Sequence, residues 1–151
     1  MTVKMKTTVT LRAKAKGTSH SRTDVTIRDL NFAIDEPTER GGTNSGPTPT
    51  DTALAALAGC TNVIGNKCAT ALGVDIGHLN IDVTCDFDRR GVTLSEEIDM
   101  PFTKLMQTVI ADGSATEEEL QKVANETEKF CPLSKLFTAA GTELITTWRK
   151  A

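Results

Sequence analysis

The residues in this sequence best suited to chemistry are its four cysteines, at positions 60, 68, 85 and 131. No pair has the C-x-x-C spacing of a zinc or thioredoxin-like site. Cys68 follows Cys60 by eight residues on one predicted helix, so their Cα atoms lie roughly 12 Å apart, too far for a disulfide. Cys85 falls on the apolar face of a predicted strand, which is typical of a buried thiol.

Cys131 and Cys60 are the candidates for a reactive thiol. Cys131 precedes Pro132, and because proline favours the first position of a helix, Cys131 is predicted to be an N-cap. The helix dipole and free N–H groups there stabilise a thiolate and lower the cysteine pKa. Cys60 has small neighbours, which leave room for a reactant to approach. For both residues the alternative is ordinary packing.

Other kinds of site are not indicated. His20 and His78 are far apart and lack helical partner spacing, so they are predicted to be surface residues and no metal site is expected. The net charge of −3 and pI of about 5.4 argue against a nucleic-acid partner. The first ten residues, MTVKMKTTVT, contain no apolar signal-peptide core. We therefore expect a protein of the reducing cytosol, with no membrane partner and with its cysteines as thiols.

The long helix that carries Cys60 is predicted from about Asp51 to Leu72 and is apolar or small nearly all round. Pro49 precedes Thr50 and Asp51, both able to cap the helix, and Gly73 is a predicted C-terminal cap. The segment is too short and too broken by Gly, Asn and Lys to span a membrane. We expect it to be buried on all sides, by a sheet and by the same helix of a second copy.

The remaining elements follow from hydrophobic periodicity and turn residues. Strands are expected at 3–13, 25–28, 30–34, 78–87 and 143–148, with one or two more in 92–111. A turn is expected at 14–21, a loop at 35–49, a capped helix at 114–130 and a short helix from Pro132 to about Ala139. This order predicts an α+β fold with a mainly antiparallel sheet, as one domain over residues 1–151.

Two stretches of this sequence resemble the OsmC/Ohr family of thiol-dependent peroxidases. They are GGTNSGPTPTDTALAALAGCT, which leads into the long helix, and FCPLSKLF about seventy residues later. The similarity extends from about Gly41 to Leu144. It implies an intertwined α+β homodimer, in which two long central helices lie between sheets built from both subunits.

The resemblance also implies a reaction. Cys60 matches the peroxidatic cysteine, whose thiolate attacks an organic hydroperoxide to give an alcohol and a sulfenic acid. Cys131 matches the resolving cysteine, which condenses with the sulfenic acid to a disulfide. A dithiol, dihydrolipoyl groups in one branch of the family, then reduces the disulfide. No metal or bound cofactor is implied, and the role is defence against oxidative stress.

The charged groups of the family site have less direct counterparts in this sequence than the two cysteines have. A thiolate in an apolar helix needs a nearby cation, and the family supplies an Arg from its N-terminal strands, held by an acidic residue near the start of the long helix. Peroxidase members have a Glu ten residues before the helix cysteine, where this sequence has Thr50, with Asp51 one residue later. Asp51 is therefore the candidate acid, and Arg22 is the candidate cation, with Arg28 and Arg40 as alternatives.

A different class of function also fits the sequence. OsmC-like members whose substrate is uncertain share a segment similar to GPTPTD. The alternative is therefore a dimer that binds a small apolar or lipid-like ligand without peroxidase turnover. Loss of the thiols of Cys60 and Cys131 on mild peroxide treatment distinguishes the two functions.

Overall fold

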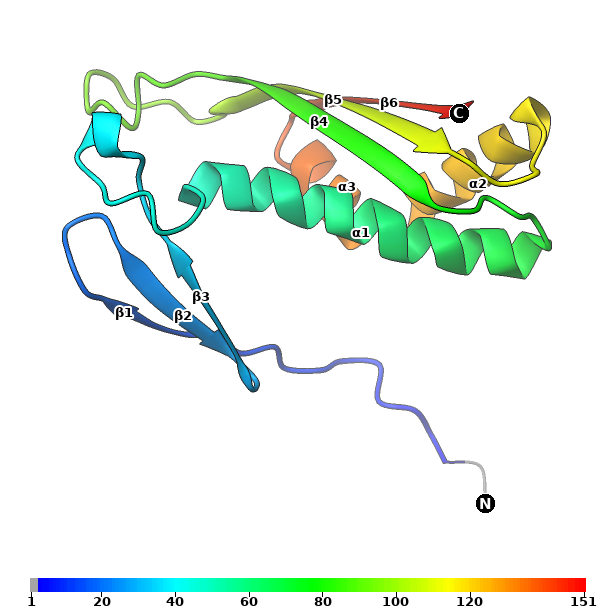
Figure 1. Ribbon diagram of the computed structural model, residues 1–151, viewed down its shortest axis with the longest axis horizontal. Coiled ribbons are helices and arrows are strands. Elements are labelled where there is room, and N and C mark those ends of the chain that lie inside the picture. Colours follow the sequence, from blue (N-terminus) through cyan, green and yellow to red (C-terminus); the bar gives the residue numbers. More distant parts are fainter. Residues whose placement is uncertain (1–2) are drawn as a thin grey trace. The chain divides into compact units, whose positions relative to one another are not determined.

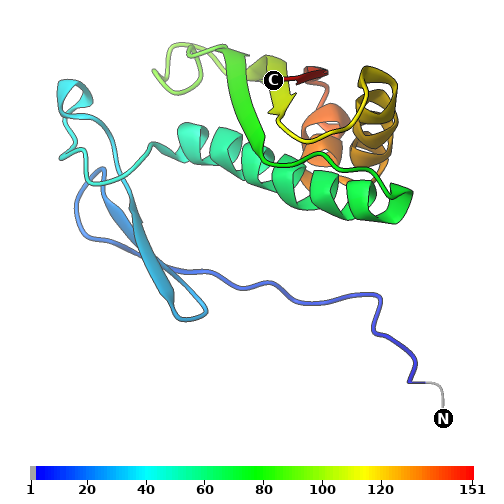
Figure 2. The ribbon, with the colours of Figure 1, turned by 45° about the vertical axis from the view of Figure 1, so that its right-hand side comes forward.

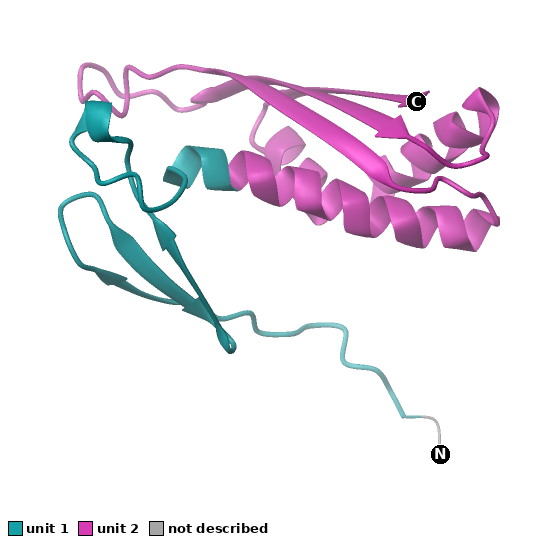
Figure 3. Ribbon diagram, viewed as in Figure 1, with its two compact units in different colours: residues 1–52 teal, residues 53–151 magenta. Residues whose placement is uncertain are grey.

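A computed structural model describes residues 3–151 of the chain. The chain divides into two compact units, residues 1–52 and residues 53–151, which Figure 3 shows in different colours. The described residues contain two three-stranded sheets, three α-helices and a short 3-10 helix, so the predicted α+β class is confirmed.

The first unit is built on an antiparallel meander of β1 (Lys14–Gly17), β2 (Thr23–Ile27) and β3 (Leu30–Ile34), labelled in Figure 1. A strand over 3–13 was the wrong prediction: that segment forms no strand, whereas Lys14–Gly17, predicted as a turn, pairs with β2. The Val- and Thr-rich pattern of 3–13 suits a strand, but a strand forms only where another strand offers its backbone groups.

A buried carboxylate organises the loop that follows β3. Asp35 is fully buried and accepts hydrogen bonds from the backbone N–H groups of Glu36, Thr43 and Ser45. The loop contains a single 3-10 turn, η1 (Thr38–Arg40). These bonds give the predicted loop a defined backbone although it has almost no regular structure.

Helix α1 (Pro49–Leu72) begins slightly before its predicted start. Its cap is Thr48, whose hydroxyl accepts the N–H of Asp51 at 3.1 Å. The prediction of Thr50 or Asp51 as the cap was wrong because Pro49 occupies the first helical position, where its missing N–H costs nothing. Gly73 ends the helix with φ of 67°, as predicted, and the N–H of Val74 bonds to the carbonyl of Ala69.

The second unit places three helices against one face of a sheet. Strands β4 (Leu79–Phe87) and β5 (Phe102–Ala111) are antiparallel, and β6 (Glu143–Lys150) pairs with β5 in parallel. Helices α2 (Glu117–Phe130) and α3 (Pro132–Ala139) form the connection between β5 and β6. Figures 1 and 2 show α1, α2 and α3 on the same side of this sheet.

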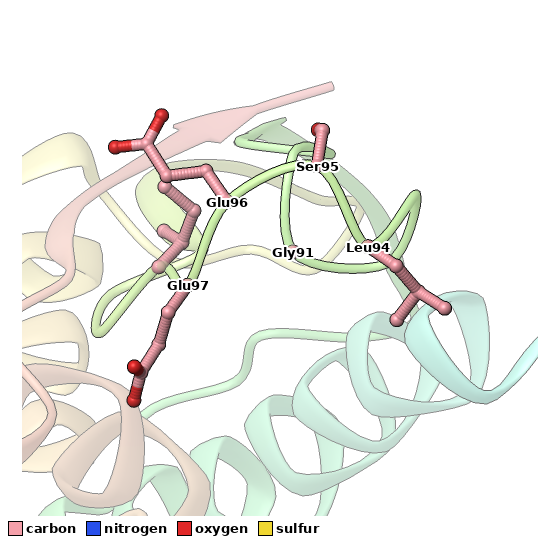
Figure 4. Close-up of a pocket in the computed structure, with 6 residues that line it drawn as sticks. Gly91, Leu94, Ser95, Glu96 and Glu97 are labelled. Carbon is pink, nitrogen blue, oxygen red and sulfur yellow. The ribbon is translucent and has the colours of Figure 1, made fainter.

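The segment between β4 and β5 is a loop, so residues 92–111, where one or two strands were expected, contain one strand, β5. The side chain of Arg90 donates to Asp88 and Glu96 and holds the loop in successive turns. Leu94 has φ of 60°, which is incompatible with a strand. Figure 4 shows the hollow of this loop, lined by Gly91, Leu94, Ser95, Glu96, Glu97 and Ile98. Two carboxylates and one hydroxyl line it, and none of the six lining residues is a cysteine.

In the single chain, α1 buries one stripe rather than its whole circumference. The buried positions are Leu57, Thr61, Gly65, Cys68 and Ala69. They face the sheet and the other two helices through two apolar clusters, one around Val109, Leu120 and Trp148 and one around Leu57, Leu105 and Phe137. The opposite face, which includes Ala55, Gly59 and Val63, is exposed. The second cluster contains Cys131, and Cys60 packs against it.

Candidate thiol site

The junction of α2 and α3 positions Cys131. Helix α2 ends at Phe130 and α3 begins at Pro132, so Cys131 is the N-cap of α3, as predicted, and also the C-cap of α2. Its backbone is extended, with φ of −70° and ψ of 112°, and this turns the side chain toward the first turn of α3. The Cys131 side chain is fully buried.

Cys60 lies on α1 and meets Cys131 although 71 residues separate them in the chain. The two Sγ atoms are 3.1 Å apart and share a hydrogen bond. Both cysteines are free thiols, and Cys60 is partly buried. The structure therefore brings together the two cysteines that the sequence singled out.

Apolar side chains surround the pair. Cys131 lies in the cluster with Leu57, Leu105 and Phe137, and Cys60 packs against the same cluster. Phe102 meets the ring of Phe137 edge to face, with centroids 5.5 Å apart. Such surroundings exclude water and strengthen hydrogen bonds to sulfur.

Cys85 of β4 packs against the same cluster, so its predicted place on the inner face of the strand is confirmed. Burial raises the pKa of Cys85, and the charge of Asp86 raises it further. This thiol is therefore protonated at neutral pH and behaves as a packing residue.

The N-terminus of α3 makes the two paired thiols unequal. Burial opposes ionisation of Cys131, but the hydroxyl and backbone N–H of Ser134 bond to its sulfur and lower the Cys131 pKa. Burial raises the pKa of Cys60, and the contact with Cys131 raises it further. The backbone N–H of Leu133 lowers the pKa of both thiols, but for Cys60 burial outweighs it.

Polar side chains lie next to the pair, and sequence reasoning missed them. Thr61, adjacent to Cys60, donates its hydroxyl to Gln107 of β5 at 2.9 Å, and Gln107 reaches Thr146 of β6 at 3.5 Å. These side chains and Ser134 line a cavity of about 10 Å³. Gln107 alternates with apolar residues on β5, and a polar residue at an inward position is the one signal that could have found it.

The candidate cations and acid belong to residues 1–52. Arg22 donates to the carboxylate of Asp24 at 3.0 Å and to the hydroxyl of Ser45 at 3.1 Å. Arg40 pairs with Glu36, and Asp51 is exposed in the first turn of α1. Arg28 occupies the two-residue turn between β2 and β3 with φ of 57°. A role for Arg22 or Asp51 at the cysteines stays a prediction.

Neither a metal centre nor a membrane span appears among residues 3–151. No group of three His, Cys, Asp or Glu side chains in this range is arranged to hold a metal ion. His20 and His78 are exposed, as predicted. Of the helices in the described part of the chain, none has the length and hydropathy to cross a bilayer.

Two thiols in contact can exchange two electrons with a substrate, because one sulfur can be oxidised and the other can then displace the oxidised group. The fold and this pair define an α+β protein with a paired-cysteine site. The profile of the family described as OsmC-like protein matches residues 42–147. The chain therefore belongs to the OsmC-like protein family.

Solved structures of low sequence identity share the fold. An OsmC-like protein from Mycoplasma pneumoniae is 17% identical, with a TM-score of 0.80 and coverage of 95% of this chain and 98% of that one. An organic hydroperoxide resistance protein from Elizabethkingia anophelis is 20% identical, with a TM-score of 0.69 and coverage of 97% and 100%. The organic hydroperoxide resistance protein OhrB of Bacillus subtilis is also 20% identical, with a TM-score of 0.63 and coverage of 93% and 98%. A search of curated proteins found no match.

Proposed function

We propose that this protein reduces organic hydroperoxides, and hydrogen peroxide as a smaller substrate, through Cys60 and Cys131. The observation that carries the proposal is the 3.1 Å contact between the two sulfurs. After oxidation of Cys60 to a sulfenic acid, Cys131 needs little movement to form the disulfide. Family membership and the hydroperoxide-resistance proteins that share the fold support a role in oxidative stress defence.

The proposal requires a reductant and a compartment. A disulfide formed at each turnover must be returned to two thiols by an external dithiol, for which a dihydrolipoyl protein is the candidate. A reducing cytosol, where both cysteines rest as thiols, suits this cycle. In this scheme Arg22, held by an acid such as Asp51, supplies the positive charge beside the thiolate of Cys60.

The proposed functional form is a homodimer. The exposed face of α1 carries small and apolar side chains, and Val63 on that face is 51% exposed. The Val- and Thr-rich segment 3–13, which was expected to be a strand, is exposed along its length and forms no strand. A second copy of the chain can cover the α1 face and provide a strand partner for 3–13.

Peroxide consumption tests the enzyme. The purified protein is mixed with cumene hydroperoxide and, in parallel, dihydrolipoamide, thioredoxin or glutathione. We expect turnover with the dithiols and none in Cys60→Ser. The matched control is Cys68→Ser, which makes the same change eight residues along α1, in the other apolar cluster, and should keep the activity. Peroxide consumption by Cys60→Ser at the wild-type rate would refute the proposal.

A binding function without turnover has one observation in its favour. An apolar groove of about 350 Å³ runs between α1 and α2, lined by Ile64, Lys67, Cys68, Ala71, Leu72, Glu126 and Phe130. Its size is at the lower end for a small-molecule site. If peroxide oxidised neither cysteine while an apolar fluorescent probe bound with a 1:1 stoichiometry per chain, this second function would replace the first.

A further inference from the structure

The attack of Cys131 on oxidised Cys60 requires that a buried thiol lose its proton. Cys131 is fully buried, and in the reduced pair its thiol donates to the sulfur of Cys60 across 3.1 Å. The thiolate, not the thiol, is the nucleophile that forms a disulfide. A proton acceptor must therefore reach the sulfur of Cys131 from within the protein.

The groups that react cannot take this proton directly. In a displacement at sulfur, the incoming sulfur and the departing group lie on opposite sides of the sulfur under attack, so hydroxide leaves Cys60 on the side away from Cys131. Apart from Cys85, whose pKa is raised by burial, the other side chains of the surrounding cluster are apolar. The acceptor must therefore belong to α3 or to the polar side chains behind it.

Ser134 lies against both the sulfur of Cys131 and the small polar cavity. Its backbone N–H is 3.4 Å from that sulfur, and its hydroxyl bonds to the same atom. The residue is only 7% exposed, and it lines the cavity of about 10 Å³. A hydroxyl both accepts and donates hydrogen bonds, so Ser134 can receive the proton of Cys131 while it passes its own proton on.

The cavity has the size and the polarity of a site for one water molecule. Its volume of about 10 Å³ is close to the minimum of roughly 10–15 Å³ that a single water needs. The amide of Gln107 and the hydroxyls of Thr61, Thr127 and Thr146 line it together with Ser134. The Gln107 amide nitrogen carries two hydrogens, and among residues 53–151 its bond is a long one, 3.5 Å to Thr146. A water here would find the two to four polar partners that a buried water requires.

Glu128 of α2 connects this cavity with solvent. It is the one titratable side chain among the residues that line the cavity, and it is exposed. A carboxylate that is reached through one water is a normal acceptor in general base catalysis. A route from Cys131 through Ser134 and one water to Glu128 therefore leads from the buried sulfur to the surface.

We propose that Ser134, a water held beside Gln107, and Glu128 form the path by which Cys131 loses its proton in the resolving step. Ser134 is a catalytic residue in this scheme because it touches the reacting sulfur, and Gln107 is a positioning residue that holds the water. This inference rests on the proposed function and adds the proton path of its second step.

The atoms and charges of the step balance. The proton of Cys131 passes to the hydroxyl oxygen of Ser134 while the hydroxyl proton of Ser134 passes to the water, and a proton of the water passes to Glu128 and then to solvent. The Cys131 thiolate, stabilised by the N–H of Ser134, attacks the sulfur of the Cys60 sulfenic acid. The S–S bond forms and the S–O bond breaks. Hydroxide leaves and takes a proton from solvent, so the product is water and no net proton is consumed.

The test follows the two oxidation steps separately. The reduced protein is mixed with one equivalent of cumene hydroperoxide over a range of pH. The sulfenic acid is trapped with dimedone, and the adduct and the disulfide are counted by mass spectrometry. In Ser134→Ala we expect the disulfide step at neutral pH to slow roughly a hundredfold relative to the sulfenic acid step, at the low end of what a positioned proton acceptor contributes. The rate should recover at high pH, where Cys131 ionises without a relay.

Further variants distinguish the path from the packing of the helices. Glu128→Gln removes the carboxylate at the solvent end and should slow the same step by less, because bulk water replaces it as acceptor. Glu118→Gln makes the same change at a position of α2 that does not line the cavity. Thr138→Ala removes a hydroxyl that bonds to the backbone carbonyl of Ser134. Both of these controls should behave as the wild type.

The outcomes separate this inference from the proposed function. If Ser134→Ala closes the disulfide at the wild-type rate at every pH, Cys131 loses its proton by another route, such as the alkoxide released in the first step, and the inference is wrong. If peroxide leaves wild-type Cys60 unoxidised, the proposed function fails, and methyl methanethiosulfonate then tests the path by placing a methylthio group on the partly exposed Cys60. Attack by Cys131 releases methanethiol. Equal closure rates in the wild type and Ser134→Ala would overturn the path in this assay as well.

Discussion

At the scale of single residues, the donors around Cys131 show how a local backbone feature sets the chemistry of a buried thiol. Burial alone favours the neutral thiol, yet two donors from Ser134 reverse this for Cys131. Cys60 packs against the same apolar cluster, and burial raises its pKa. Comparable hydrogen bonds elsewhere in the chain give two predictions at this scale.

The first prediction concerns the hydroxyl of Thr61. Thr61→Val keeps the shape of the side chain but leaves the buried amide oxygen of Gln107 without its donor at 2.9 Å. We expect a loss of about 1–3 kcal/mol in the free energy of unfolding, measured with urea. Thr61→Ser keeps the hydroxyl and should lose less. Equal losses in the two variants would show that the hydrogen bond contributes nothing.

The second prediction concerns the stability of the fold in acid, which depends on Asp35. The bond from the Thr43 hydroxyl, followed by bonds from the N–H groups of Ser45 and Glu36, lowers the pKa of Asp35. The carboxylate therefore stabilises the fold fully above its unfolded pKa of about 4, and this is lost as the pH falls toward the lower folded value. Asp35→Asn should be less stable than the wild type at neutral pH, and the difference should shrink as acid is added. A constant difference in urea midpoint across this range would contradict the assignment.

At the scale of elements, the long helix meets the sheet at one position where it has no side chain, Gly65. A Cβ atom built on Gly65 would lie 2.8 Å from the ring of Trp148 on β6. The missing side chain at Gly65 therefore leaves room for the ring of Trp148 against α1.

Gly65→Ala should therefore destabilise the protein although alanine favours a helix. Overpacking costs about 1–3 kcal/mol, against a gain of about 1 kcal/mol in helix propensity. We expect a net loss by thermal or urea unfolding. In a Trp148→Phe background the clashing ring atoms are absent, so the same change should be neutral or stabilising. A loss of equal size in both backgrounds would rule out Trp148 as the cause.

At the scale of the whole molecule, the exposed face of α1 is the feature that one chain leaves unexplained. A long helix that buries one stripe, with apolar and small residues opposite, fits the proposed dimer better than a monomer. Light scattering coupled to size exclusion should give twice the chain mass.

Val63→Glu places a charge on this face and should shift the mass toward the monomer. Val92→Glu makes the same change in the loop between β4 and β5, where Val92 is also exposed, and should leave the dimer intact. A wild-type mass of 16.2 kDa at micromolar concentration would refute the dimer.

The sequence by itself determined most of the local elements and the two candidate cysteines, Cys60 and Cys131. The long helix, the capping box of Thr116 and Glu119, and the N-cap at Cys131 all follow from residues close together in the chain. Such features depend on nearest-neighbour geometry, which propensity and spacing describe well. The motifs around Cys60 and Cys131 also pointed to the family, which the profile match confirms.

Only the tertiary structure decided the rest. The contact of Cys60 with Cys131, the parallel pairing of β6 with β5, and the Thr61–Gln107 bond join residues that are tens of positions apart. The failure of 3–13 to form a strand has the same origin, because a strand needs a partner and no local pattern supplies one. Long-range contacts depend on how whole elements pack, so the contact of the two sulfurs could be recognised only once the structure placed Cys131 beside α1.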